Sequence, residues 1–96
     1  MLLHLLNRSP ASSGVAHDVL RAMGPDDRLL LIESGVYGAV GPQATLFSAL
    51  HGRCFALADD LASRGLSECC ADWITVLDMQ GFVMLTEETQ RTVSWF

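Results

Sequence analysis

Short apolar runs alternate with longer mixed segments along this chain. The first run covers residues 2–6 (LLHLL) and ends at the polar stretch 7–10. A helix beginning here would have to break at Ser9, because the residue before a proline is pushed out of the α region. Strands buried on both faces of a parallel sheet read as continuous apolar runs, so residues 2–6 predict such a strand.

A helix and a second strand follow the first run. The helix has apolar residues at helical spacing, namely Val15, Ala16, Val19, Leu20 and Met23. Ser12 or Ser13 can cap this helix, and Gly24-Pro25 ends it. Residues 28–32 (RLLLI) predict a second buried strand. The order strand, helix, strand predicts a right-handed crossover between parallel neighbours.

The same alternation then repeats. Residues 43–50 predict a second helix, whose apolar face holds Leu46, Phe47 and Leu50. Residues 54–57 (CFAL) predict a third strand. Asp59 can cap a short helix after it. Residues 73–77 (WITVL) have the β-branched and aromatic content of a fourth strand.

The last third of the chain completes the predicted fold. Asp78 can cap a helix that runs towards Thr89, and residues 92–95 predict a short final edge strand. Five strands with intervening helices predict an α/β fold, a small Rossmann-like sheet that is mostly parallel and has helices on both faces. A chain of 96 residues leaves no room for a second core, so we expect one domain over residues 1–96.

Composition adds an expectation about assembly. Half of the residues are apolar and 18% are charged. This excludes a disordered chain, because disorder requires low hydrophobicity and high charge. A domain of this size buries only about 60–70% of its unfolded surface. The surplus apolar surface predicts an oligomer or a subunit of a larger assembly.

Charge and hydropathy limit the partners and the location. The formal net charge is −5, with 6 basic residues against 11 acids, and this argues against direct binding of nucleic acid. No apolar run reaches the roughly 18 residues of a membrane span. The N-terminus has no basic leader, so we expect a cytoplasmic chain whose three cysteines are free thiols.

Ligands of open α/β sheets bind beyond the carboxyl ends of the strands. This rule selects four segments, which are residues 7–13, 33–41, 58–60 and Asp78. The first loop lacks the glycine pattern of a phosphate site. In the second, an exposed Val36-Tyr37 with Val40 behind it could form a contact surface, because tyrosine combines apolar area with a polar tip. Core positions for Val36 and Val40 are slightly favoured over this.

The cysteines are the candidate nucleophiles. Cys54 begins a buried strand, where apolar surroundings raise a thiol pKa, so it is expected to be inert. Cys69 and Cys70 lie in a loop and stay open as reactive thiols. Their Cα atoms should be about 3.8 Å apart, below the usual disulfide range of roughly 4.4–6.8 Å. Neither His51 with Cys54 nor the adjacent pair makes a zinc pattern, so no metal and no cofactor is predicted.

The histidines and acids add no predicted site. His4 lies inside an apolar strand, His17 on the polar side of a helix, and His51 at a helix end, where a protonated ring gains from the helix dipole. No two acids have a spacing that alone would place them in one cleft.

Several ordered blocks carry a resemblance to a known family. They are LHL and RSP near the start (3–5 and 8–10), LLLIESGVY (29–37), FALADDLASRGL (55–66), VLDMQGFVMLT (76–86) and SW (94–95). Any one block is weak, but the ordered set is specific. On these blocks the chain resembles the TusB/DsrH family over essentially its whole length.

The resemblance implies a DsrEFH-like subunit that joins homologous TusC-like and TusD-like partners in a cytoplasmic heterohexamer. The complex relays persulfide sulfur, in the Tus branch towards 2-thiouridine at the tRNA wobble position and in the Dsr branch towards sulfur oxidation. The resemblance places the sulfur-carrying cysteine on the TusD-like partner. Some DsrH-type members carry a cysteine in the first helix, where this chain has Val19. The resemblance therefore implies a non-catalytic subunit of the Tus branch.

Three alternatives remain open. They are a DsrH-type subunit of a sulfur-oxidation relay, a persulfide carrier that uses Cys69 or Cys70, and a small nucleotide-binding module suggested by sheet topology alone. Aromatic and apolar groups near loops and a terminus are natural interface anchors. The predicted partner contacts are accordingly Tyr37, Val40, Trp95 and Phe96, with core packing as the rival role for Trp95.

Overall fold

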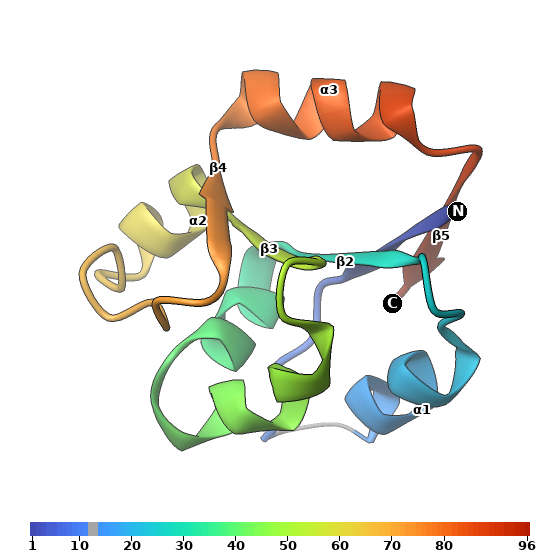
Figure 1. The fold of residues 1–96 in the computed structure, drawn as a ribbon. Coiled ribbons are helices and arrows are strands. Elements are labelled where there is room, and N and C mark those ends of the chain that lie inside the picture. Colours follow the sequence, from blue (N-terminus) through green and yellow to red (C-terminus); the bar gives the residue numbers. More distant parts are fainter. Residues whose placement is uncertain (12–13) are drawn as a thin grey trace.

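The described residues, 1–11 and 14–96 of a computed structural model, build a parallel sheet of five strands (Figure 1). The strands are β1 (Leu2–Leu6), β2 (Arg28–Leu31), β3 (Cys54–Leu57), β4 (Thr75–Leu77) and β5 (Arg91–Trp95). Their order is β4-β3-β2-β1-β5, and every neighbouring pair is parallel. The predicted α/β, Rossmann-like class is confirmed.

Helices cover the two faces of this sheet unequally. The helical segments are α1 (Val15–Ala22), the 3₁₀ segments η1 (Glu33–Ala39) and η2 (Gly41–Leu50), α2 (Ala58–Ser63) and α3 (Met79–Glu88). In Figure 1, α3 lies alone above the sheet, while α1 and the green 33–50 region lie below it. The asymmetry follows from the topology, because the chain crosses from edge strand β4 to the opposite edge strand β5 through α3.

Two apolar clusters reflect these two faces. The larger cluster joins alternate residues of the strands to α1, η1, η2 and α2, with Phe47 as its largest fully buried side chain. The smaller cluster lies under α3 and is made by Leu3, Leu5, Leu30 and Leu85, with Ile32, Phe55, Leu77 and Phe82 packed against it. At the edge of the smaller cluster, Phe55 and Leu77 remain partly exposed to solvent.

The segment between β2 and β3 differs from the prediction. A loop and an α-helix over 43–50 were expected, whereas the structure has consecutive 3₁₀ segments from Glu33 to Ala39 and from Gly41 to Leu50. Close packing explains part of this difference. A Cβ on Gly38 would lie 2.8 Å from the Phe47 ring, so the two segments approach too closely for a side chain at that position. Val36 is fully buried and belongs to the core.

Some predicted boundaries also change. Asp59 is not a cap, because α2 already begins at Ala58 and Asp59 lies within its first turn. The fourth strand begins at Thr75 rather than at residue 73. The predicted cap residues Ser12 and Ser13 lie outside the described residues. The cap at Asp78 is confirmed, since its Oδ1 accepts a hydrogen bond from Gly81 N–H at 2.8 Å.

Candidate functional site

The loop before β4 places the two candidate reactive cysteines. Cys70 forms an isolated antiparallel bridge with Val40, and Ala71 N–H donates to the Ala39 carbonyl at 2.8 Å. Cys69 is exposed, whereas Cys70 is half-buried. Burial raises the pKa of the Cys70 thiol, and the negative charge of Asp72 raises it further. Both effects disfavour the thiolate form that a nucleophile or persulfide carrier uses.

Cys54, the third thiol, is even less suited than Cys70 to act as a nucleophile. Cys54 is fully buried at the start of β3, and desolvation, followed by the neighbouring Cys70, raises its pKa to about 12. This placement confirms the predicted buried position at a strand start. Val19, where some DsrH-type proteins are expected to hold a cysteine, is fully buried in the larger cluster.

The four predicted partner contacts lie in different settings. Tyr37, on η1, is exposed, and Val40, beside Cys70, is half-buried. Phe96 follows β5 and exposes 64% of its surface. Trp95 is half-buried against the larger cluster, so both roles weighed for it from the sequence remain compatible with its position.

Trp95 also belongs to a buried hydrogen-bond network around His4. The indole Nε1–H donates to His4 Nδ1 at 3.0 Å, and His4 Nε2 lies 2.9 Å from Asp27 Oδ2. An indole N–H can only donate, so Nδ1 accepts and the neutral ring carries its proton on Nε2, which donates to Asp27. The network connects β5 through β1 to the turn before β2.

Asp27 receives further donors in this network. Leu2 N–H donates to its Oδ1 at 2.9 Å, and Gly24 N–H donates to its Oδ2 at 3.0 Å. Burial alone raises the pKa of Asp27, but the hydrogen bonds from Gly24, His4 and Leu2 outweigh it and lower the pKa from 3.8 to about 2. The ionised carboxylate is therefore a structural acceptor that fixes the start of β1 against this turn.

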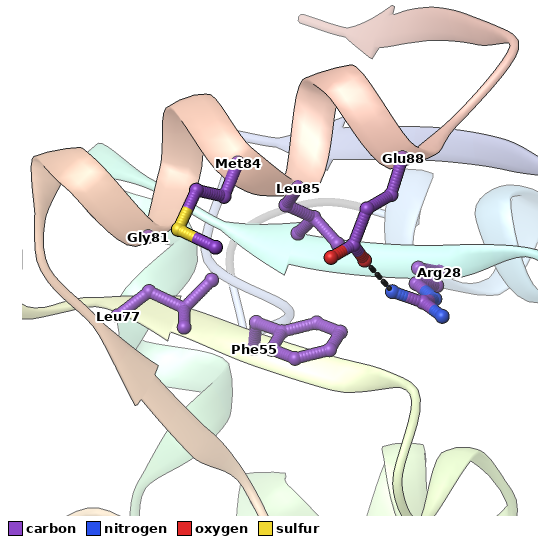
Figure 2. A pocket seen from close by; sticks show the side chains of 7 residues that line it. All are labelled: Arg28, Phe55, Leu77, Gly81, Met84, Leu85 and Glu88. Atoms are coloured by element: carbon purple, nitrogen blue, oxygen red, sulfur yellow. Dashed lines mark hydrogen bonds and ion pairs between the residues drawn. The ribbon is translucent and has the colours of Figure 1, made fainter.

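A groove opens between α3 and the β3–β4 side of the sheet (Figure 2). Its volume is about 260 Å³, and its lining is mainly apolar. The lining residues are Arg28, Phe55, Leu77, Gly81, Met84, Leu85 and Glu88. Figure 2 shows Met84 reaching down over Leu77 at one end and the Arg28–Glu88 ion pair near Phe55 at the other, with Nη1 and Oε2 2.8 Å apart.

Two acids at the carboxyl edge of the sheet, Asp60 and Asp78, hold the backbone in place through hydrogen bonds. Asp60 Oδ2 accepts a hydrogen bond from Glu33 N–H at 2.7 Å, where Glu33 has a φ of 49°. Asp78 caps α3.

Within residues 1–11 and 14–96, no group of three or more His, Cys, Asp or Glu side chains could hold a metal ion. In the same ranges no helix is long and apolar enough to cross a membrane.

Comparison with known proteins assigns the family. A family model described as "DsrH like protein" matches residues 8–92. The chain belongs to the DsrH-like family. Two curated relatives named Protein TusB, from Serratia proteamaculans (strain 568) and Escherichia coli (strain K12), are 35% and 34% identical to it. Each alignment covers 98% of this chain and 100% of the relative, so the chain is a TusB-like member of the DsrH-like family.

Solved structures agree on the fold. The crystal structure of the ychN protein from E. coli has a TM-score of 0.75 at 12% identity, covering 97% of both chains. The solution structure of Tm0979 from Thermotoga maritima has a TM-score of 0.67 at 24% identity, covering 92% of this chain and 93% of the other. At these sequence identities the two likenesses show a shared fold and nothing about function.

Two features of the site were missing from the sequence predictions. The groove needs α3 and β3 side by side, which local patterns do not encode. The His4 network joins residues 23 and 91 positions apart in the chain. A signal was available for His4, because a polar side chain in the middle of a buried strand requires hydrogen-bond partners.

Proposed function

We propose that this chain is a non-catalytic subunit of a cytoplasmic sulfur relay that supports 2-thiolation of the tRNA wobble uridine. Its partners would be TusC-like and TusD-like homologous subunits in a heterohexamer. The TusD-like subunit would accept the sulfane sulfur on its own cysteine, and this chain would hold that subunit in place. Full-length similarity to proteins named TusB supports this choice of branch.

The state of the thiols is the observation that carries the proposal. Val19 occupies the first-helix position at which some DsrH-type proteins hold a cysteine, and it is a core residue here. The pKa values of Cys54 and Cys70 are raised, which favours the protonated thiol over the thiolate. A subunit with this arrangement contributes contacts to the assembly rather than sulfur chemistry.

Co-expression with TusC-like and TusD-like proteins tests the proposal. Native mass spectrometry should detect one complex containing all three chains. After incubation with a persulfide donor, the mass increment of one sulfur atom should appear on the TusD-like chain and not on this one. A chain that stays monomeric beside both partners would contradict the proposal.

Cys69 is the exposed thiol, and for that reason a carrier role is the second candidate. Replacing both loop cysteines, as Cys69→Ser with Cys70→Ser, is expected to leave sulfur transfer through the complex within about twofold of wild type. The rate of tRNA 2-thiolation in a reconstituted relay measures this. As a positive control, serine at the TusD-like partner's cysteine should abolish transfer. A comparable loss from the double variant would establish the carrier role instead.

A further inference from the structure

The buried ring of His4 makes two hydrogen bonds that only a neutral imidazole can make together. Its Nδ1 accepts from the Trp95 indole N–H at 3.0 Å, and its Nε2 donates to Asp27 Oδ2 at 2.9 Å. A protonated imidazole has two N–H donors and no acceptor. Because an indole N–H can only donate, a proton on Nδ1 would place two N–H groups against each other. The bond between Trp95 and His4 therefore requires the neutral ring.

We propose that His4 and Trp95 form a pH-sensitive switch that holds or releases the C-terminal end of β5. With neutral His4, the indole bond keeps Trp95 against β1. When Nδ1 takes a proton from solvent, the bond from Nε2 to Asp27 remains and the bond from the indole to Nδ1 breaks. Trp95 then moves away from the ring together with Phe96. This inference concerns the chain alone and goes beyond the proposed function without resting on it.

Trp95, rather than His4, is the residue that can move. His4 lies in the middle of β1, with β2 and β5 paired on its two sides, and exposes 2% of its surface. Trp95 is half-buried and is the last residue of β5, an edge strand of the sheet (Figure 1). An edge strand is paired on one side, so its end can move without breaking a second ladder. Phe96 follows it and is exposed, so it moves with Trp95 at little cost.

The charges around the ring allow it to become protonated in place. Asp27 is the charged side chain that bonds to His4. Although burial raises the pKa of Asp27, its hydrogen bonds lower it to about 2, so the carboxylate is ionised and can pair with a protonated ring. Arg53 faces the same turn through its bond to the Asp27 carbonyl oxygen at 2.8 Å.

Other charged groups near β1 are turned away from the ring. The elements that pack most against β1 are α1, β2 and β5. The remaining titratable and charged side chains on these elements and on the turn before β2 are exposed or paired elsewhere, namely His17, Asp18, Arg21, Asp26, Arg28 and Arg91. The amino group of Met1 donates to Gln90. Asp27 is thus the charge that decides how the ring responds to a proton.

Nuclear magnetic resonance on the wild-type chain tests the switch. Long-range proton–nitrogen spectra should show His4 as the Nε2–H tautomer near pH 8. Solvent exchange of the Trp95 indole N–H is then compared with that of a free indole at the same pH. As His4 becomes protonated between about pH 8 and pH 4, the protection of this N–H should fall at least about tenfold.

Trp73 is the matched internal control. Its ring centroid lies 6.4 Å from that of His51, close to the 6.1 Å between Trp95 and His4. Among the described residues, however, no hydrogen bond joins Trp73 to His51. The protection of the Trp73 indole N–H should therefore stay within about twofold over the same pH range.

Two variants should move the titration midpoint of His4 in opposite directions. Trp95→Phe removes a hydrogen bond that only the neutral ring accepts, so the midpoint should rise to higher pH. Asp27→Asn removes the negative charge that favours the protonated ring but keeps an oxygen that can accept from Nε2, so the midpoint should fall to lower pH. The midpoint of the exposed His17 should be the same in all three proteins.

Three results would each overturn the switch. A His4 ring that stays neutral down to about pH 4 could not operate it. An unchanged protection of the Trp95 indole while His4 titrates would show that their bond does not hold the end of β5. A His4 midpoint that does not rise in Trp95→Phe would show that Nδ1 is not the acceptor of the indole N–H.

Discussion

Replacing Gly35 with alanine is expected to remove a large part of the stability of this protein. A Cβ on Gly35 would lie 2.0 Å from the carbonyl oxygen of Leu6 and 2.9 Å from its carbonyl carbon. Both are backbone atoms and cannot rotate away. The same oxygen accepts a hydrogen bond from Ile32 N–H at 3.0 Å, so separating the segments also breaks the link between the ends of β1 and β2.

Overpacking of a core usually costs about 1–3 kcal/mol, and a clash of the added Cβ with backbone atoms of Leu6 belongs at the upper end of this range. We expect Gly35→Ala to lower the free energy of unfolding by about 3 kcal/mol. At this chain length each kcal/mol shifts the melting temperature by about 4–8 °C, so the variant should melt roughly 12 °C or more below wild type. Thermal unfolding followed by circular dichroism measures this.

Gly14→Ala is the matched control. Nothing lies within 4 Å of a Cβ built on Gly14, and its φ of −80° is one that alanine adopts freely. Gly14 is the N-cap of α1, where alanine is less favourable than glycine, and this offsets the gain from a stiffer unfolded chain, so the variant should melt within a few degrees of wild type. If Gly35→Ala also melted with wild type, η1 would be able to move away from β1 at little cost, contrary to the packing described above.

The strands could be predicted from the sequence because burial on both faces leaves a direct mark. Residues 2–6 are apolar except for His4, and residues 54–57 are apolar throughout; both became strands at the predicted positions. The Asp78 cap was equally local, because it depends on one carboxylate and one amide three residues later. The same local rule was wrong at Asp59, which lies within the first turn of α2 and does not cap it.

The remaining features depend on neighbours in space. The apolar spacing of residues 43–50 suits a helix, but it does not distinguish an α-helix from the 3₁₀ segment that packs Phe47 against Gly38. A helix was predicted after Asp78, but its path across the sheet was not. Along that path the helix leaves Phe55 partly uncovered, and this creates the groove. The groove could not be predicted from local sequence patterns.

The family assignment came from a different kind of signal. The hydrophobic pattern, the charge and the cysteine positions alone did not decide between a relay subunit, a thiol carrier and a nucleotide-binding module. The ordered sequence blocks indicated the TusB/DsrH family, and the match over residues 8–92 confirmed membership of the DsrH-like family. One of these blocks contains Gly35, which lies too close to the Leu6 carbonyl for any side chain. The fold itself therefore requires glycine at this position of the block.

Replacing Asp27 with alanine is the second change with a large expected effect. Its carboxylate accepts hydrogen bonds from Leu2 N–H, Gly24 N–H and His4 Nε2. Truncation leaves all three donors without their acceptor. The bond from His4 is buried and the two amide bonds are part-buried, so each loss lies near the lower end of the roughly 1–3 kcal/mol that an unsatisfied buried group costs. We expect Asp27→Ala to lower the free energy of unfolding by about 3 kcal/mol, measured by urea denaturation at pH 7. Asp26→Ala, at the exposed neighbouring acid, should change it by less than about 0.5 kcal/mol.

The same network makes stability depend on pH in a predictable direction. The pKa of Asp27 is about 2 in the folded protein, below its ordinary value of 3.8. A lowered pKa means that the folded state favours the ionised carboxylate. The stabilisation is therefore fully present above about pH 4 and is lost as the pH falls towards 2.

Urea denaturation repeated between pH 7 and pH 2 tests this dependence. Wild type and Asp26→Ala should lose stability together between about pH 4 and pH 2, because both retain the Asp27 carboxylate. Asp27→Asn should be less stable than wild type at pH 7, and the difference between the two should shrink as the wild-type carboxylate becomes protonated. If the difference in the free energy of unfolding between wild type and Asp27→Asn stayed constant down to pH 2, the negative charge of Asp27 would contribute nothing to stability. The three donors around it would then have to be satisfied in some other way.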